Sequence, residues 1–447
     1  MKKLIYHKDL LIMLFLLILF AGCKKDNVAQ QEKDNPIAPR IFDNGRVFSG
    51  AYIINEGDTA KFTGLQYTPA DKVKISWLVN NKPTASGTSF NFKPTTGGEF
   101  TIKLVVTYNG DSSVRSTKVL VNPSTYSFKP YTNVTMAYLT SAGTAANINW
   151  NIVTHVAYKV GLVAPDGSID VSAGEVNQTA NELVARAHIN GVPILMGVSG
   201  RLSGIDGWAI YDVSDFGTPL QDATKRTAMV NTIKAYIASK KMDGVDIMMT
   251  DINADTGAPE NIHAIGPFLA ELRAALPPTA IITVTASVNY QHWEYPDLSA
   301  ADWVNIHDFE DNIHIGPGAP VGQSSSYDFM VSGAQIWTQF HLPANKIVIG
   351  MPAFGLRYDQ LDADGNNLSW GSYSYVTYSD ILAFDPTAYG KEEAAMGSGV
   401  YFNGVPLVTQ KATWAKNNGF KGCYLWAEDY DVQGPNSLLS AIFNAQK

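Results

Sequence analysis

Eight short apolar segments recur along residues 131–447, and helical stretches lie between several of them. This order of strand, helix and strand predicts a parallel sheet. Eight such units in a segment of this length are typical of the TIM (β/α)8 barrel, an α/β fold whose functional residues lie at the carboxyl ends of the strands. The predicted strands are residues 132–139, 155–163, 192–200, 242–251, 281–288, 303–310, 346–355 and 422–428.

Two of the helical stretches carry specific signals. Residues 179–191 open with Thr179 and Glu182, a capping-box pair, and close on Gly191. Residues 227–242 place apolar side chains at helical spacing, which predicts one buried helix face. The side chains of that face are Met229, Val230, Ile233, Tyr236 and Ile237.

Residues 40–122 contain short β-type runs separated by turn residues, which predicts an N-terminal all-β sandwich. Trp77 alternates with polar neighbours on one run and is the expected core residue, while "NNKP" and "YNGD" predict hairpin turns. The segment resembles immunoglobulin-like modules of the polycystic-kidney-disease (PKD) type. Such a module is expected to act as a spacer, with glycan binding as the alternative, and residues 123–130 form a linker.

The N-terminus has the pattern of a secretory signal. Lysines at positions 2, 3 and 8 precede a short apolar run that ends in small residues and Cys23. "LFAGC" resembles the bacterial lipobox, in which the cysteine becomes the lipidated first residue of the mature protein. The expected organisation is a lipoprotein signal peptide over residues 1–22, lipidation at Cys23 and a flexible tether over residues 23–39.

The composition argues against several classes of ligand. A net charge of −8 offers no basic face for a polyphosphate, so no nucleic acid partner is expected. Cys423 lies in the apolar run "GCYLW" and is expected to be buried, and no Cys or His cluster has metal-ligand spacing. We therefore expect neither a metal nor another cofactor. The 9 Trp and 21 Tyr are compatible with a neutral ligand such as a sugar.

Residues 131–447 resemble glycoside hydrolase family 18, the chitinases and endo-β-N-acetylglucosaminidases. The fourth predicted strand carries Asp243 and Asp246 where the family motif Asp-x-x-Asp-x-Asp-x-Glu has its first two aspartates. Trp426, in the eighth strand, corresponds to the tryptophan at the floor of the family's sugar site.

Three further strands carry looser matches to the same family. "GMPAFG", residues 350–355, is similar to the Gly-x-Pro-x-Tyr-Gly of the seventh strand, with Phe354 in place of Tyr. "HDFE", residues 307–310, takes the place of Met-x-Tyr-Asp on the sixth strand. "GVSG", residues 197–200, is a relaxed form of the Ser-x-Gly-Gly of the third.

The fourth predicted strand differs from the family motif at the positions of the catalytic residues. Side chains alternate along a strand, so Asp246, Met248 and Thr250 should project into the barrel mouth together. In the family the last two are Asp, which orients the N-acetyl group of the substrate, and Glu, which protonates the glycosidic oxygen. Met248 and Thr250 cannot do this work, and losing a general acid alone costs about 10² to 10⁴ in rate. Hydrolysis by the family's route is therefore not expected.

A relocated acid remains an alternative. Asp251 would need a bulge to reach the mouth, because a shift of one residue moves a side chain to the opposite face. Other carboxylates at strand ends are Asp308, Glu310, Glu428 and Asp429. We favour the interpretation that such groups bind sugar hydroxyls.

The predicted glycan site combines an apolar floor with polar groups at strand ends. Its apolar members are Trp426, Phe309, Phe354 and Tyr138, and its polar members are His307, Glu310, Asp246 and Asn305. Aromatic residues that could extend it are Trp208, Tyr290, Trp293 and Trp370. Residues 357–420 look shorter than the α+β insertion of many chitinases, which predicts a shallower cleft.

These observations lead to one functional hypothesis. The chain is expected to be a non-catalytic surface lipoprotein that captures GlcNAc-containing glycans of the N-glycan or chitooligosaccharide type. It would face the cell exterior from the outer membrane, beside glycan-uptake proteins. The alternatives are an active glycosidase with a displaced acid, and a barrel that binds proteins instead of glycans.

Overall fold

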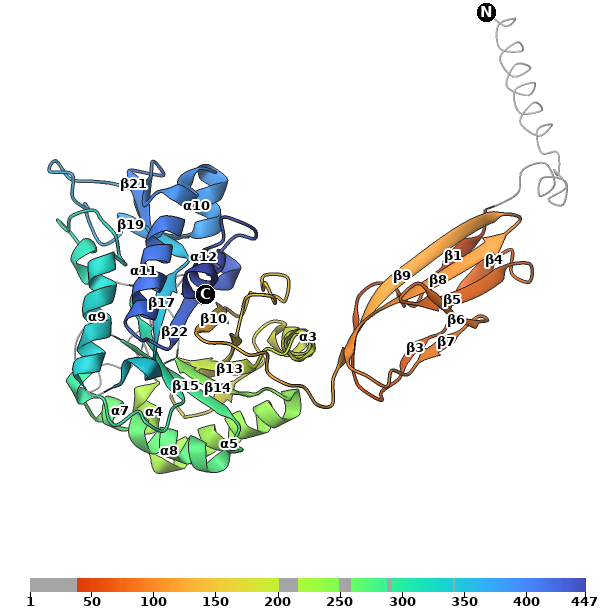
Figure 1. The fold of residues 1–447 in the computed structure, drawn as a ribbon, viewed down its shortest axis with the longest axis horizontal. Coiled ribbons are helices and arrows are strands. Elements are labelled where there is room, and N and C mark those ends of the chain that lie inside the picture. Colours follow the sequence, from red (N-terminus) through yellow and green to blue (C-terminus); the bar gives the residue numbers. More distant parts are fainter. Residues whose placement is uncertain (1–37, 201–215, 249–258, 288–291, 310, 341) are drawn as a thin grey trace, which may run out of the picture. The chain divides into compact units, whose positions relative to one another are not determined.

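The computed structural model describes residues 38–200, 216–248, 259–287, 292–309, 311–340 and 342–447. The described residues form two compact units, of which the first comprises residues 38–94 together with residues 99–119. The second comprises residues 95–98 and 120–447 (Figure 1).

Eight parallel strands of the second unit close into a barrel, because β10 pairs with β11 on one side and with β22 on the other. The predicted α/β TIM barrel is confirmed, and each predicted strand segment contains one barrel strand. In their order around the barrel the strands are β10 (Val134–Leu139), β11 (His155–Val163), β13 (Ile194–Ser199), β14 (Gly244–Met248), β15 (Ile281–Ser287), β16 (Trp303–His307), β17 (Ile347–Pro352) and β22 (Gly422–Trp426). A short strand, β12 (Ile169–Asp170), pairs antiparallel with β11.

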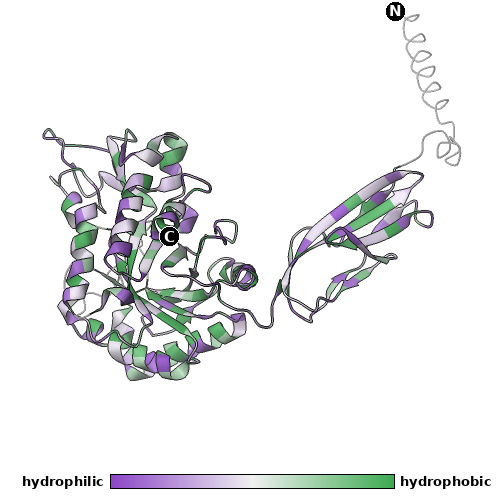
Figure 2. Ribbon diagram, in the orientation of Figure 1, coloured by the Kyte–Doolittle hydropathy of each residue, from purple (hydrophilic) through white to green (hydrophobic). Residues whose placement is uncertain are grey.

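Helices cover the outer face of the barrel (Figure 1), and Figure 2 shows hydrophobic residues along the strands with mixed hydrophilic and hydrophobic residues on the helices. The α-helices are α3 (Val176–Ile189), α4 (Gly217–Leu220), α5 (Ala223–Lys240), α7 (Pro259–His263), α8 (Ile265–Ala275), α9 (Tyr327–Gln339), α10 (Tyr378–Phe384), α11 (Val405–Asn417) and α12 (Leu438–Gln446). Short 3₁₀ turns are η1 (His292–Glu294), η2 (Asn312–His314), η3 (Ala344–Lys346), η4 (Ala388–Gly390) and η5 (Glu428–Tyr430).

The two helix predictions fared differently. The buried residues of α5 are the five predicted from its periodicity. Helix α3 begins at Val176, one turn before the expected Thr179, so Thr179 and Glu182 do not cap it. Glu182 instead pairs with Arg186 four residues later, at 2.8 Å, an ordinary helix-surface contact.

The segment between β17 and β22 forms a small α+β unit. Its antiparallel sheet has the order β19 (Tyr373–Thr377), β18 (Phe354–Tyr358), β21 (Gly399–Phe402) and β20 (Glu393–Ala394), with α10 after β19. The four strands of this sheet were not predicted from the sequence, whereas the shorter insertion and the shallower cleft stay predictions. Turn residues hid the short strands, because each has only two to five residues between polar stretches.

The first unit is all-β, as predicted. Its largest sheet has the order β2 (Tyr52–Asn55), β9 (Asp111–Asn122), β8 (Gly98–Tyr108), β5 (Lys74–Val79) and β6 (Lys82–Ser86), and two further pairs are β1 (Arg40–Phe42) with β4 (Gln66–Thr68) and β3 (Ala60–Phe62) with β7 (Phe90–Phe92). Trp77 is fully buried, and its indole nitrogen donates to the Gly87 carbonyl at 2.9 Å.

Both predicted hairpin turns are present in this unit. Asn80 and Asn81 join β5 to β6 with φ of 50° and 64°. Asn109 and Gly110 join β8 to β9 with φ of 49° and 91°. Two-residue loops with positive φ match the twist of the flanking strands, and Asn and Gly adopt that backbone most readily.

Candidate functional site

Strand β14 carries the residues that distinguish this barrel. All five of its residues are buried, and Asp246 lies in register with Gly197 of β13 and Thr283 of β15. A Cβ on Gly244 would lie 1.9 Å from the carbonyl oxygen of Ile281, so only glycine allows β14 and β15 to approach this closely.

Asp246 is the centre of a buried hydrogen-bond network. Its carboxylate accepts from the Tyr138 hydroxyl at 2.5 Å, from the amide of Asn305 at 2.9 Å and from the Thr283 hydroxyl. The same Asn305 amide donates to Tyr138 at 2.9 Å, and the Trp303 indole donates to the Asn305 oxygen at 3.0 Å. Asp246 and Asn305, both predicted to contact glycan, are completely buried, and their protein partners fix them as braces across four strands.

Burial determines the protonation of this network. Removal from water raises the pKa of Asp246 to about 6, although the hydrogen bonds from Thr283, Tyr138 and Asn305 oppose the shift. Burial and the neighbouring Asp246 charge raise the pKa of Tyr138 well above its ordinary value. Tyr138 therefore stays a neutral donor toward Asp246 at any physiological pH.

Met248 lies two residues further along the same face and belongs to an apolar cluster inside the barrel. The cluster, called the mouth cluster below, consists of Val134, Met136, Tyr138, Ala157, Leu195, Met248, Trp303, Phe309, Val348, Phe354, Tyr424, Trp426 and Ala427, with Tyr375 of β19 packed against it. Met248 is 3% exposed and Trp426 is 1% exposed. A carboxylate in place of Met248 would thus have to be desolvated among hydrocarbon side chains.

Aromatic contacts organise the mouth cluster. The Trp426 and Tyr138 rings lie 5.4 Å apart, and Phe309 contacts Phe354 edge-on at 6.0 Å. Phe354 in turn meets Tyr375 edge-on at 5.4 Å, so the cluster continues into the α+β unit. The structure brings together four predicted apolar site residues, and β18, not β17, supplies Phe354.

His307 lies beside this cluster. Its ring is 4.1 Å from that of Phe309, and burial lowers the pKa of His307 to about 3. The imidazole is therefore neutral near pH 7 and could act only as a neutral hydrogen-bonding group.

Asp243 lies at the opposite end of β14 from Met248. Its carboxylate accepts from the Ile194 backbone amide at 2.8 Å and from the Tyr126 hydroxyl, and the His188 ring contacts it at 3.2 Å. The Tyr126 ring also stacks on His188 at 4.1 Å. Asp243 thus connects the linker to the base of the barrel. Its hydrogen bonds share no residue with the Asp246 network.

The family model for glycosyl hydrolases family 18 matches residues 105–431, which span the barrel described above. The chain belongs to this family. Among curated relatives, Chitinase 1 of Aphanocladium album is 22% identical over 338 residues, which cover 64% of this chain and 78% of that protein.

Solved structures of chitinases share the fold. A chitinase from Bacteroides thetaiotaomicron is 21% identical with a TM-score of 0.58, and the match covers 71% of this chain and 97% of that one. A mutant class V chitinase from Nicotiana tobaccum in complex with NAG4 is 15% identical with a TM-score of 0.56, covering 70% of this chain and 99% of that one.

The described candidates for a relocated family 18 acid differ in their surroundings, and both oxygens of Asp308 and one of Glu428 have no hydrogen-bond partner among the described residues. Asp308 alternates with the inward-facing residues of β16 and lies close to Lys411 of α11, on the helix side of the strand. Asp429 accepts from the backbone amide and the hydroxyl of Thr140. Glu428 is buried next to Asp431, and burial raises its pKa well above the usual range.

Other predicted residues differ in their placement. Trp293 and Trp370 are exposed by 57% and 67%, and Cys423 is buried as predicted. Several predictions lie outside the described residues: Cys23, Trp208, Thr250, Asp251, Tyr290 and Glu310. In the described part of the chain, no group of three or more His, Cys, Asp or Glu could hold a metal ion, and no helix is long and apolar enough to cross a membrane.

Thr283 and Thr285 of β15 belong to the Asp246 network but were not predicted. Thr285 contacts the Tyr138 hydroxyl at 3.0 Å. The alternation of threonine with apolar residues in "IITVTAS" was the available signal, because hydroxyls on one face of a buried strand need polar partners. Tyr424 was also missed, although it lies two residues before Trp426 on the same strand, and strand alternation places both side chains on one face.

Proposed function

We propose that the family 18 barrel of this protein binds a GlcNAc-containing saccharide without hydrolysing it. The observation that carries the proposal is the position of Met248. It lies on the inward face of β14 after Asp246, buried in the mouth cluster, where the family's substrate-assisted route needs a carboxylate to orient the N-acetyl group. Thr250 at the position of the general acid removes the second requirement.

The aromatic residues retained in the mouth cluster support saccharide binding. Trp426 supplies a large flat surface, and Phe354 and Tyr375 continue the aromatic surface toward the α+β unit. NAG4 in the complex of the Nicotiana tobaccum chitinase gives the class of ligand to test first. Since Trp426 is 1% exposed, the ligand must displace side chains packed over it. Met248 is suited to such movement because methionine is unbranched and has several rotatable bonds.

The cellular setting is part of the same proposal. Lipidation of Cys23 would hold the protein at the outer membrane, with the sandwich as a spacer and the barrel presented to glycans outside the cell. Glycan-uptake proteins would be its neighbours there. Globomycin treatment of expressing cells, which blocks cleavage of lipoprotein signals, should make the unprocessed form accumulate; unchanged processing would contradict lipidation.

The test of binding without hydrolysis is a paired measurement. Chitotetraose and N-glycoproteins are titrated into the protein by calorimetry, and the same mixtures are analysed for released products by mass spectrometry. We expect saturable binding and no product. Product formation that is abolished by one carboxylate substitution would contradict the proposal, and absence of any glycan binding would favour a protein-binding barrel.

Trp426→Phe tests the place of binding. It keeps an aromatic ring in the mouth cluster but reduces the stacking surface, so saccharide affinity should fall by about tenfold while the fold persists. Trp77→Phe replaces an equally buried tryptophan in the sandwich and serves as the matched control. Equal affinity of the wild type and a folded Trp426→Phe variant would remove Trp426 from the site.

A further inference from the structure

The flank of the barrel between β15 and β16 is covered in an unusual way. In the described part of that connection, residues 292–302, the only helical element is the single turn η1. The segment is held on one side by Arg273 of α8, which donates to the Ala300 carbonyl at 3.1 Å and to Asp302 at 2.7 Å. On the other side Tyr295 packs edge-on against Trp337 of α9 at 5.0 Å.

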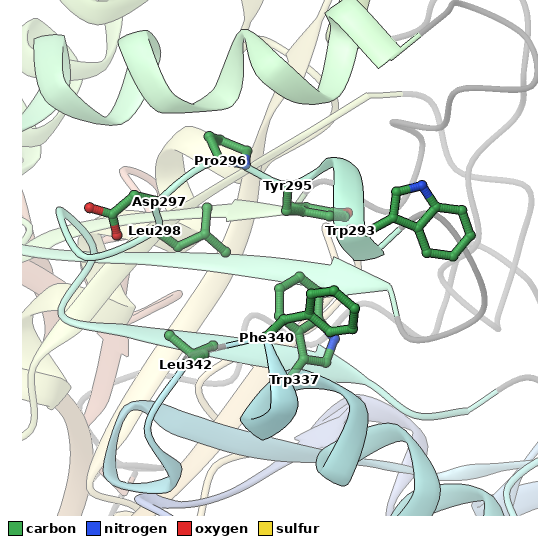
Figure 3. Close-up of a pocket in the computed structure, with 8 residues that line it drawn as sticks. All are labelled: Trp293, Tyr295, Pro296, Asp297, Leu298, Trp337, Phe340 and Leu342. Atoms are coloured by element: carbon green, nitrogen blue, oxygen red, sulfur yellow. The ribbon is translucent and has the colours of Figure 1, made fainter.

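This thin cover leaves a groove of about 400 Å3 between the segment and the end of α9. Trp293, Tyr295 and Asp297 line it from the segment, and Trp337 and Phe340 line it from the α9 side (Figure 3). Figure 3 shows Trp293 and Asp297 at opposite ends of the groove. Trp293 is 57% exposed and Phe340 is 45% exposed.

We propose that this groove is a second binding site, separate from the barrel mouth, for one or two rings of a neutral saccharide. Its volume lies at the small end of the range for small-molecule sites and is far too small for a partner helix or a protein domain. The exposed rings of Trp293 and Phe340 match the apolar faces of pyranose rings.

Asp297 supplies the polar end of the site. Its two oxygens accept from the Ser299 amide at 2.9 Å and the Ser299 hydroxyl at 2.7 Å, which fixes the orientation of the carboxylate. Each oxygen keeps a lone pair that can accept from a sugar hydroxyl. The exposed Asp297 carboxylate points away from the lining rings (Figure 3), so a polyol that extends past the rings can donate a hydroxyl to it, which a purely apolar ligand cannot do.

No residue of the groove belongs to the mouth cluster, so the two sites can be tested separately. Protein containing 5-fluorotryptophan gives a ¹⁹F signal for each of its 9 Trp. The signals of Trp293 and Trp426 are identified by their loss in Trp293→Phe and Trp426→Phe. Chitotetraose and cellotetraose serve as probes, because the groove has no group that selects for an acetamide.

We expect the Trp293 signal to shift saturably with both oligosaccharides. Phe340→Ala should raise the half-saturation concentration at Trp293 about tenfold, and Phe384→Ala, which removes an exposed aromatic ring at the end of α10, should leave it unchanged.

The two tryptophan signals separate the possible outcomes. A shift at Trp426 without one at Trp293 would overturn the groove site and leave the proposed function intact. A shift at Trp293 alone would support the groove and contradict binding at the mouth. A Trp293 signal that ignores both sugars but responds to a proline-rich peptide would overturn the assignment to saccharide, and no response at either tryptophan would overturn both proposals.

Discussion

Met248 and Asp246 lie two residues apart on one strand, yet they impose opposite demands on their surroundings. Asp246 is held by three protein donors in a polar layer of the barrel. Met248 is surrounded by the apolar side chains of the mouth cluster. The layer of the barrel that follows Asp246 could orient an acetamido group if it held a carboxylate. Met248 makes this layer apolar, so that it excludes charge.

Restoring the general acid alone should not restore hydrolysis. Thr250→Glu supplies a proton donor but leaves Met248 where the N-acetyl group must be oriented, so turnover of chitotetraose should stay at background. Met248→Asp combined with Thr250→Glu returns both groups, with a loss of stability of about 2–4 kcal/mol from burying the new carboxylate. Activity is measured by product release and stability by urea unfolding. Robust turnover by Thr250→Glu alone would show that Met248 is not the obstacle.

Asp246 should leave a signature in the pH dependence of stability. Its pKa is raised from 3.8 to about 6, so between these values the folded state holds a proton that the unfolded chain has released. The free energy of unfolding should therefore fall as the pH rises from 4 to 6, by about 3 kcal/mol from this group, and stay lower above pH 6.

Asp246→Asn should remove that share of the decline. Asp431, whose pKa burial also raises to about 6, contributes a similar decline that remains in the variant. The measurement is urea unfolding at half-unit pH steps from 4 to 7. Parallel curves for wild type and Asp246→Asn would contradict the assigned pKa.

Helix α11 is joined to the segment before α9 by a buried lysine. Lys411 is fully buried, and its ammonium group donates to the Ser325 carbonyl at 2.7 Å, the Ser325 hydroxyl at 2.9 Å and Asn403 at 2.6 Å. Burial lowers the pKa of Lys411 to about 7, and the nearby Asp308 opposes that shift. Burial raises the pKa of Asp308 well above its ordinary value, and the positive charge of Lys411 opposes this rise. The helix is thus positioned by polar contacts inside an apolar layer.

Lys411→Met should test this tie. The substitution preserves the length of the side chain but leaves three acceptors without their donor and Asp308 without a cation, so the free energy of unfolding should fall by roughly 3–5 kcal/mol. Lys416→Met, on the exposed side of the same helix, should change it by less than about 0.5 kcal/mol. Equal stability of the two variants would mean that packing alone places α11.

The linker is part of the barrel unit and not a free connection. The Tyr126 hydroxyl donates to Asp243, and the Asn122 side chain is hydrogen-bonded to the His188 ring. The backbone amide of Lys129 donates to the Gly191 carbonyl at 2.8 Å. These contacts satisfy polar groups at the base of the barrel. The compact unit accordingly begins near residue 120, eleven residues before the predicted barrel boundary at 131.

Two fragments should differ in stability for this reason. Residues 120–447 should fold and bind saccharide like the whole chain, because the unit keeps its linker contacts. Residues 131–447 leave Asp243 and His188 without Tyr126 and Asn122, and the free energy of unfolding should fall by roughly 2–4 kcal/mol. Thermal and urea unfolding of both fragments provide the measurement. Identical midpoints would show that the linker contributes nothing to the barrel.

The fold was predictable because its signals are local. Eight apolar runs, the periodicity of α5 and the asparagine turns of the sandwich each depend on a few neighbouring residues, and all are present in the structure. The start of α3 was misjudged, because a capping pair can also occur inside a helix. The short strands between β17 and β22 were not predicted, because strands of two to five residues have no clear periodicity.

Spacing along the chain was enough to predict the barrel and the loss of the two acidic positions at Met248 and Thr250, because strand alternation assigns a face to each residue. The role of each polar group became visible in the folded barrel. Asp243 holds the linker, Asp246 braces four strands and Asp308 lies near Lys411 of a helix, although all three lie in or directly beside barrel strands in the sequence. The reason is that hydrogen-bond partners and desolvation depend on residues that are distant in the chain and meet only after the barrel closes.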